Sequence, residues 1–261
     1  MTAETISAGA RTADLSGGSR LRRKFCRALV EQIDQVTPKM RLIRLTGPDV
    51  AGLSWTPGQQ VRVCVREWSG PAAGGRVVLK VPRAVLRSYS VWKYDGEGLE
   101  LCVLDHGDGP GTRWARGLRP GDRVLFRRPQ GSFVTVPGAA YHVFAGEETA
   151  AVAFGAMLRA LPGDAAIYGV IEVAAPADRL PLPRSAQLEM WYRGVESAVG
   201  SASLVTAIAE LDLPAEPGVA YVAGEARTCQ AVRNLLVRER GWPRKSVLVK
   251  PFWTPGKRGM G

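Results

Sequence analysis

Hydrophobic and polar residues alternate in short runs through the first half of the chain, which is the period of half-buried β-strands. In one run Val61, Val63 and Val65 alternate with Arg62 and Cys64. Short strands of this kind, spaced by Gly and Pro turn signals within residues 41–136, predict an antiparallel β-barrel or sandwich. The other β-rich runs span residues 77–81, 88–94, 99–104 and 123–126.

The pattern changes near Pro137 and Gly138, beyond which short apolar strands alternate with helices. Such alternation predicts a parallel sheet, so a β-domain at residues 23–137 should precede an α/β domain at residues 138–261. Residues 1–22 are expected to form a disordered tail. We expect strands at 141–145, 165–173, 188–192, 219–223 and 246–252. We expect helices at 149–160, 201–211 (capped by Ser201) and 227–240 (ended by Gly241).

Composition narrows the class of protein. The chain has 261 residues, of which 46% are hydrophobic and 23% are charged, as in ordinary globular domains. Its four cysteines form no C-x-x-C pair, so neither a zinc site nor an iron–sulfur cluster is expected, and a reducing compartment suits them. No apolar run approaches ~20 residues, and no signal peptide is recognisable. We therefore expect a cytoplasmic monomer with no membrane partner.

A formal net charge of +11 raises the question of a nucleic-acid partner. We recognise neither a basic helix nor a nucleic-acid motif, so no such partner is expected. Part of the excess gathers near the C-terminus, where no acidic residue follows Glu239. A basic face there would attract an anionic small molecule or the phosphates of a cofactor; a solvated surface is the alternative.

The segment Arg87-Ser88-Tyr89-Ser90 begins one of the predicted strands. A flavin bound on a barrel needs a cation at its pyrophosphate, a flat aromatic against its rings, and a small hydroxyl or N–H group facing its reactive N5 atom. Arg87, Tyr89 and Ser90 can supply these groups, because residues two apart on a strand share one face and the next residue adjoins it. A surface Arg–Tyr pair without a ligand is the alternative.

A glycine-rich turn, Asp105 to Ala115, follows the next predicted strand and leads into a short predicted helix that Thr112 would cap. N–H groups exposed at the start of a helix bind phosphate, and glycines let the backbone approach closely. A plain Gly/Pro turn is the alternative. His106 is one of only two histidines, and a lone histidine is more often structural than catalytic.

Two Gly-Glu pairs lie at the carboxyl ends of predicted parallel strands, where open α/β sheets place their ligands. One belongs to the segment Gly146 to Thr149 and the other to Gly224-Glu225-Ala226. Neither forms G-x-G-x-x-G, so no dinucleotide fingerprint is present. Each pair is also compatible with an ordinary β–α turn.

The order of these segments resembles that in the siderophore-interacting proteins, a family of FAD-dependent ferric-siderophore reductases among the ferredoxin-reductase-like flavoproteins. The ordered series, which covers nearly the whole chain from about Arg23, is far more specific than any one member. It consists of Arg87-Ser-Tyr-Ser, His106 to Ala115, Ala145-Gly-Glu-Glu-Thr-Ala, Met190-Trp-Tyr-Arg, Tyr221-Val-Ala-Gly-Glu-Ala, Arg233, the turn Glu239 to Trp242, and Phe252-Trp253.

This resemblance implies a six-stranded antiparallel FAD-binding β-barrel followed by a Rossmann-like parallel-sheet domain for NAD(P)H. It implies that Ser90, as the catalytic residue, lies near N5 of the flavin. NADH, NADPH and a ferredoxin stay open as the electron donor, with Arg193 and Arg227 as candidates for meeting a 2′-phosphate. The other residues that would hold FAD are Arg87, Tyr89, His106, Gly107, Pro110, Gly111, Thr112, Trp114 and Thr149. Those that would border the nicotinamide are Gly224, Glu225 and Ala226.

Two segments depart from the family pattern. The usual Gly-Pro-x-Gly turn after the barrel is Arg128-Pro-Gln-Gly, and the usual closing Gly-Tyr-Trp-Arg-x-Gly is Pro251-Phe-Trp-Thr-Pro-Gly. Thr254 therefore stands where the family's arginine helps to grip an anionic siderophore. The residues that would bind the siderophore here are Arg62, Lys250, Trp253, Lys257 and Arg258.

The implied activity is the reduction of a ferric siderophore, which releases iron(II) because hard oxygen ligands hold iron(III) far better. Electrons would pass from NAD(P)H to FAD as a hydride and then singly to the metal. Two alternatives stay open. One is an FAD-dependent enzyme of secondary-metabolite biosynthesis that acts on an organic substrate, and the other is a non-catalytic flavin- or ligand-binding protein.

Overall fold

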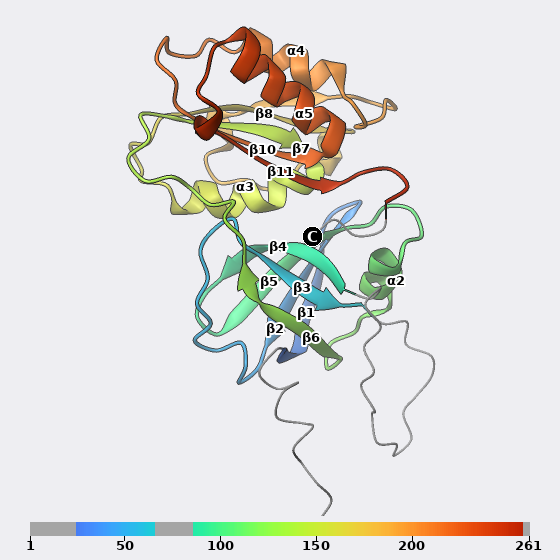
Figure 1. The fold of residues 1–261 in the computed structure, drawn as a ribbon. Helices are drawn as coiled ribbons and strands as arrows, with labels where there is room; N and C mark the ends of the chain where they lie inside the picture. Colours follow the sequence, from blue (N-terminus) through green and yellow to red (C-terminus); the bar gives the residue numbers. More distant parts are fainter. Residues whose placement is uncertain (1–24, 66–85, 258–261) are drawn as a thin grey trace, which may run out of the picture.

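A computed structural model describes residues 25–65 and 86–257 of the chain. A barrel forms one half of the molecule, and a sheet flanked by helices forms the other (Figure 1). The predicted tail at residues 1–22, the predicted strand at 77–81 and Arg258 lie outside the described residues.

The first half is a closed antiparallel barrel with the strand order β1-β2-β5-β4-β3-β6, which confirms the six-stranded barrel. Its interior is filled by alternate residues of the strands, such as Val61, Val63 and Leu101, all completely buried. The short helix α2 (Pro110–Gly117) adds Ala115 and Trp114 to this core. The strands are β1 (Cys26–Thr37), β2 (Met40–Thr46), β3 (Gln60–Cys64), β4 (Leu86–Tyr94), β5 (Gly98–Leu104) and β6 (Arg123–Gln130).

Strand β1 was not among the strands expected from the hydrophobic pattern. Its pairing with β2 shifts register between Val30 and Gln32 and again between Gln35 and Thr37. A bulge inserts an extra residue into a strand and so breaks the strict alternation on which the prediction depends.

The second half is a five-stranded parallel sheet with the strand order β11-β10-β7-β8-β9, which confirms the predicted parallel sheet. Helix α3 covers the face toward the barrel, whereas α4 and α5 cover the opposite face (Figure 1). The strands are β7 (His142–Glu147), β8 (Ile167–Val173), β9 (Glu189–Tyr192), β10 (Val219–Glu225) and β11 (Val247–Trp253). The α-helices are α3 (Glu148–Ala160), α4 (Ala202–Glu210) and α5 (Ala226–Asn234).

The helix ends differ partly from expectation. Ser201 caps α4 as predicted, by accepting a hydrogen bond from the N–H of Leu204 at 3.1 Å. Thr112 does not cap α2, because the helix begins earlier, after Gly109. The last predicted helix begins at Ala226 and continues beyond α5 as a π-helical turn. The remaining short elements are η2 (Pro176–Asp178), η3 (Ser185–Gln187), η4 (the π-helix Leu235–Glu239) and η5 (Arg244–Ser246).

The two halves pack through β4 and α3. A Cβ atom on Gly155 of α3 would lie 2.2 Å from a ring carbon of Trp92, so only glycine fits there. Arg159 lies over the same ring, 5.0 Å from its centroid, and donates a hydrogen bond to the Trp92 carbonyl. Residues two apart on a strand share a face, so Ser90 lies on the same face of β4 as Trp92, the face next to α3. The boundary at residues 137 and 138 stays a prediction; β6 ends at Gln130 and β7 begins at His142.

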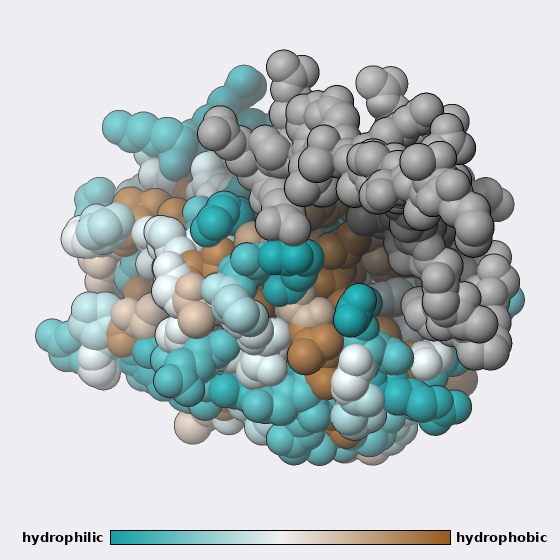
Figure 2. Space-filling view, turned by 90° about the horizontal axis from the view of Figure 1, so that it is seen from below, coloured by the Kyte–Doolittle hydropathy of each residue, from teal (hydrophilic) through white to brown (hydrophobic). Residues whose placement is uncertain are grey.

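The surface at the barrel end carries mainly hydrophilic side chains with smaller hydrophobic patches between them, where it is visible (Figure 2). Over residues 25–65 and 86–257, no helix combines the length and apolar character needed to cross a membrane.

Candidate functional site

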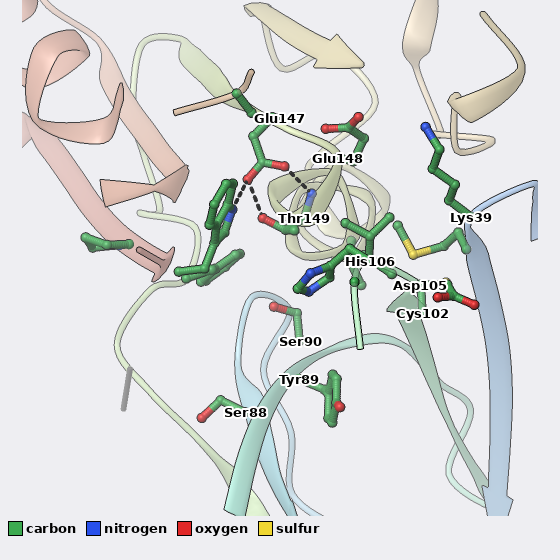
Figure 3. A pocket seen from close by; sticks show the side chains of 18 of the residues that line it. Lys39, Ser88, Tyr89, Ser90, Cys102, Asp105, His106, Glu147, Glu148 and Thr149 are labelled. Atoms are coloured by element: carbon green, nitrogen blue, oxygen red, sulfur yellow. Dashed lines mark hydrogen bonds between the residues drawn. The ribbon is translucent and has the colours of Figure 1, made fainter. Parts of the chain in front are cut away.

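A cleft of about 560 Å³ lies between the barrel and the carboxyl edge of the parallel sheet (Figure 3). Gln60, Ser90 and His106 line it from the barrel, and Thr149 and Trp253 line it from the sheet. In Figure 3, Thr149 at the start of α3 lies between Glu147 and the Ser90 end of the cleft. The cleft therefore joins residues that are far apart in sequence.

The outer face of β4 carries the serines and its inner face carries the tyrosine. Tyr89 pairs with Val61, which is completely buried inside the barrel, whereas Ser90 pairs with Gln60 on the cleft side. Tyr89 stacks on Trp114 with a centroid distance of 5.7 Å and an interplanar angle of 26°. Burial raises the pKa of the Tyr89 hydroxyl, so this group stays protonated.

The start of α2 comes close to this aromatic pair. A Cβ atom on Gly111 would lie 2.6 Å from the Tyr89 hydroxyl and 3.8 Å from the side chain of Arg87. No side-chain hydrogen bond caps this helix, which leaves its first N–H groups for another acceptor, and a phosphate is the kind of acceptor that helix N-termini bind. Thr112 donates its hydroxyl hydrogen bond to the His106 carbonyl at 2.9 Å and so fixes the glycine-rich turn.

Glu147, at the end of β7, is the buried carboxylate of the first Gly-Glu pair, to which the sequence analysis gave no individual role. Its Oε2 accepts a hydrogen bond from the Thr149 N–H at 2.8 Å, and its Oε1 accepts from the Thr149 hydroxyl at 2.5 Å and from Trp253 Nε1 at 2.9 Å. Burial raises the pKa of Glu147 to about 7, and the negative charge of Glu148 adds to this, although the hydrogen bonds oppose it. The sequence signals were its position at the carboxyl end of a predicted parallel strand and directly before a predicted helix.

Glu148 and Arg193 form a buried ion pair beside Glu147. The two guanidinium nitrogens donate to the two carboxylate oxygens of Glu148 at 2.8 and 2.5 Å, and Arg193 also lies 3.7 Å from Glu172. The side chain of Arg193 is therefore already engaged by two carboxylates. Arg227, the other candidate for a 2′-phosphate, is exposed.

The second Gly-Glu pair caps α5 and does not line the cleft. Oε2 of Glu225 accepts hydrogen bonds from the N–H groups of Thr228 at 2.9 Å and of Gly200 at 3.1 Å. Burial alone would raise the pKa of Glu225, but hydrogen bonds from these groups and from the Arg227 N–H outweigh it and lower the pKa.

The predicted site residues fall into three groups. Those that line the cleft are Tyr89, Ser90, His106, Gly107, Thr149 and Trp253. Those gathered around Tyr89 and the start of α2 are Arg87, Pro110, Gly111, Thr112 and Trp114. Those outside the cleft are Gly224, Glu225, Ala226, Arg62, Lys250 and Lys257.

The predicted siderophore-binding residues are spread around the cleft. Lys250 lines a smaller hollow of about 250 Å³, which shares Gln60 and Phe252 with the cleft. Arg62 pairs with Ser88 across β3 and β4, on the outer face of the barrel. Lys257 is exposed after the end of β11.

An antiparallel barrel and a parallel sheet that share a cleft define a flavoprotein of the ferredoxin-reductase-like class. The fold is similar to that of phthalate dioxygenase reductase, with a TM-score of 0.67 at 15% identity over 91% of this chain and 71% of that one. The chain belongs to the siderophore-interacting protein family. Residues 29–133 match the siderophore-interacting FAD-binding domain, and residues 139–256 match the siderophore-interacting protein domain.

Two relatives support this assignment. The ferric vibriobactin reductase ViuB of Vibrio cholerae is 29% identical over 189 residues, which are 70% of either chain. The crystal structure of a siderophore utilization protein from T. fusca has a TM-score of 0.74 at 27% identity and covers 91% of this chain and 95% of that one. The resemblance found in the sequence and the FAD-binding character of the barrel are thus confirmed, while the roles of single residues stay predictions.

Proposed function

We propose that this protein reduces a ferric siderophore in the cytoplasm and thereby releases iron(II), with electrons from NADH or NADPH. A ferredoxin is the alternative donor. The likeness to a ferric vibriobactin reductase and the FAD-binding barrel support the proposal. The observation that carries it is the cleft of about 560 Å³, in which Ser90 of the barrel and Thr149 of the second half line opposite walls.

The residues present fit FAD. Bound there, FAD would accept a hydride and pass on electrons one at a time. Arg87 and the uncapped start of α2 would hold its pyrophosphate, and Tyr89 with Trp114 would offer a flat aromatic surface. The Ser90 hydroxyl would form a hydrogen bond at the reactive edge of the ring system.

The siderophore would bind where positive charge borders the cleft. Lys250 lies in the adjoining hollow, and Arg62 lies on the barrel face beside Ser88. A net charge of +11 favours the approach of an anionic chelate. Trp253, Lys257 and Arg258 complete the proposed set.

The test is anaerobic reduction of the FAD-loaded protein by NADH or NADPH, followed by addition of ferric siderophores and an iron(II)-specific chromogenic chelator. We expect the flavin to bleach and then recover while iron(II) forms. In Ser90→Ala, flavin reduction by the donor should slow by roughly 100-fold with FAD content unchanged. Ser88→Ala, the same change on the same strand face, is the control and should alter the rate far less.

Failure of every ferric chelate to reoxidise the reduced flavin would overturn the proposal. Reoxidation by an organic substrate alone would favour the biosynthetic alternative. FAD that binds but accepts electrons from no donor would favour the non-catalytic one.

A further inference from the structure

Glu147 is a carboxylate in the wall of the cleft, and no residue of the described part of the chain forms a salt bridge with it. Its exposed fraction is 2%, and its partners among the described residues are the N–H and hydroxyl of Thr149 and the indole of Trp253. The nearby guanidinium of Arg193 is held by Glu148. Gly224 lies against the carboxylate of Glu147: a Cβ atom there would lie 2.6 Å from Oε1. Because glycine has no side chain, it adds no side-chain donor to Glu147. The hydrogen bonds to Glu147 among the described residues thus come only from neutral donors, and Arg193 acts on its charge through space.

The charged neighbours of Glu147 act on it in opposite directions: Glu148 raises its pKa, whereas Arg193 attracts its negative charge. The neighbouring acid on β8, Glu172, accepts hydrogen bonds from two serine hydroxyls. Strand β11 contributes only the neutral Trp253. The groups facing Glu147 from the elements packed around it are Glu148 on α3, Glu172 on β8, Arg193 after β9, Glu225 on β10, Cys229 on α5 and His106 across the cleft.

We propose that Glu147 takes up a proton when FAD in this cleft is reduced and releases that proton when the electrons leave. The inference rests on the proposed function only in that FAD binds here. Hydride transfer from NAD(P)H adds two electrons and one proton to FAD, and so leaves one extra negative charge on the flavin. Glu147 then binds one proton from solvent, which restores the charge of the cleft. When two ferric ions take one electron each, the flavin loses its proton and Glu147 loses the one it gained.

The physical reason is electrostatic. Two like charges a few ångströms apart interact far more strongly in a buried site than in water, so added charge in the cleft favours the neutral form of Glu147. An ordinary glutamate could not take up a proton in this way, because its carboxylate titrates far below neutral pH. Here burial already brings the pKa of Glu147 to about 7, so a modest further rise changes its protonation at physiological pH. The Thr149 hydroxyl, hydrogen-bonded to Glu147 in the cleft wall, provides a route for the proton (Figure 3).

The test is potentiometric titration of the FAD-loaded protein with dithionite between pH 6 and pH 9, which needs neither a nicotinamide nor a siderophore. The slope of midpoint potential against pH reports the protons taken up per electron pair. Because Glu147 with a pKa of about 7 is already half protonated at pH 7, we expect Glu147→Gln to take up at most about half a proton fewer than the wild type at pH 7, and close to one proton fewer near pH 8. Glu225→Gln, the same change at the other buried helix-capping glutamate, is the control and should keep the wild-type slope.

Infrared difference spectra between reduced and oxidised protein give a second measurement. We expect the carbonyl band of a protonated carboxyl group on reduction of the wild type and of Glu225→Gln, and its absence in Glu147→Gln. If Glu147→Gln does not fold, Trp253→Phe replaces it, because loss of one donor to the charged form should move the proton uptake to higher pH. Equal slopes in all proteins, or a band that survives in Glu147→Gln, would overturn the inference and leave the proposed reductase activity untouched.

Discussion

The two Gly-Glu turns at the carboxyl edge of the sheet use the same local structure for opposite electrostatic outcomes. Glu147 and Glu225 each end a parallel strand, each cap the following helix with a side-chain oxygen, and are 2% and 1% exposed. Yet the pKa of Glu147 is raised to about 7, whereas that of Glu225 is lowered. Helix capping therefore does not by itself decide whether such a carboxylate is charged.

The difference comes from the balance between desolvation and hydrogen bonding, and from the kind of donor. Desolvation dominates at Glu147, and two of its three hydrogen bonds come from side chains, those of Thr149 and Trp253. At Glu225 the hydrogen bonds outweigh desolvation, because backbone N–H groups of neighbouring turns converge on it. Fixed backbone donors stabilise a negative charge in the way an anion-binding turn does. One turn thus keeps a permanent charge, while the other responds to its surroundings.

The largest loss of stability is expected for Gly224→Ala, which alters the surroundings of Glu147. The residue has φ of +120°, which disfavours any side chain, and the new Cβ would lie 2.6 Å from Oε1 of Glu147. We expect the free energy of unfolding to fall by about 4 kcal/mol, from backbone strain and from disturbance of the carboxylate. Urea denaturation of the FAD-loaded protein measures it.

Gly241→Ala is the control for Gly224→Ala, since it also has positive φ, +73°, but its Cβ would contact nothing within 4 Å. It should cost about 1 kcal/mol. Equal losses in the two variants would show that contact with Glu147 adds nothing to the strain.

The next effect is the pH dependence of stability. The pKa of Glu147 rises on folding from 4.5 to about 7, so the folded state binds the proton more tightly, and the stability gained at low pH is lost as pH rises from 4.5 to 7. Each unit of pKa corresponds to about 1.4 kcal/mol. The stability of the wild type relative to Glu147→Gln should therefore fall by about 3 kcal/mol across this window, as measured by urea denaturation at successive pH values.

Glu225→Gln should give the opposite pH dependence of the free energy of unfolding. Because the pKa of Glu225 is lowered on folding, its contribution is present above pH 4.5 and is lost as pH falls below that value. Between pH 5 and pH 8 the wild type and this variant should run parallel. A decline like that expected for Glu147 would contradict the assignment of a permanent charge to Glu225.

The smallest expected changes in stability come from replacing the threonines beside the two carboxylates, Thr149 and Thr228. Thr149→Val removes one donor to Glu147 and should cost about 1 kcal/mol at pH 8, where the carboxylate is charged, and less at pH 5. Thr228→Val should cost about 2 kcal/mol at both pH values, since it leaves the Ser201 N–H and the Ala198 carbonyl without a partner. Thermal or urea unfolding distinguishes the two patterns. The same pH dependence in both variants would remove the distinction.

Much of the architecture was predictable because it depends on local periodicity. Alternation around Val61 identified a barrel strand, and Ser201 was recognised as a cap from its own sequence context. Local periodicity failed where the chain departs from regular geometry, as at the bulge near Val30. The position of Ser90 in the cleft followed from its strand and the family resemblance.

The unusual proton affinity of Glu147 could not be predicted in this way. Its donor Trp253 is 106 residues away in sequence, and its burial depends on how α3, β10 and β11 meet. Sequence spacing reveals that a glutamate follows a strand, but not how deeply folding encloses it. The same limit applied to Arg193, whose pairing with Glu148 appears only when the start of α3 and the segment after β9 come together.

The packing of Gly155 against Trp92 has a mechanical consequence. With no space between helix and indole, and with Arg159 held over the ring, the barrel and the sheet cannot slide past each other without separating this contact. In the proposed reductase, this contact would hold the FAD-binding barrel at a fixed spacing from the sheet that faces it across the cleft. A residue without a side chain would thus act as a spacer between the two halves.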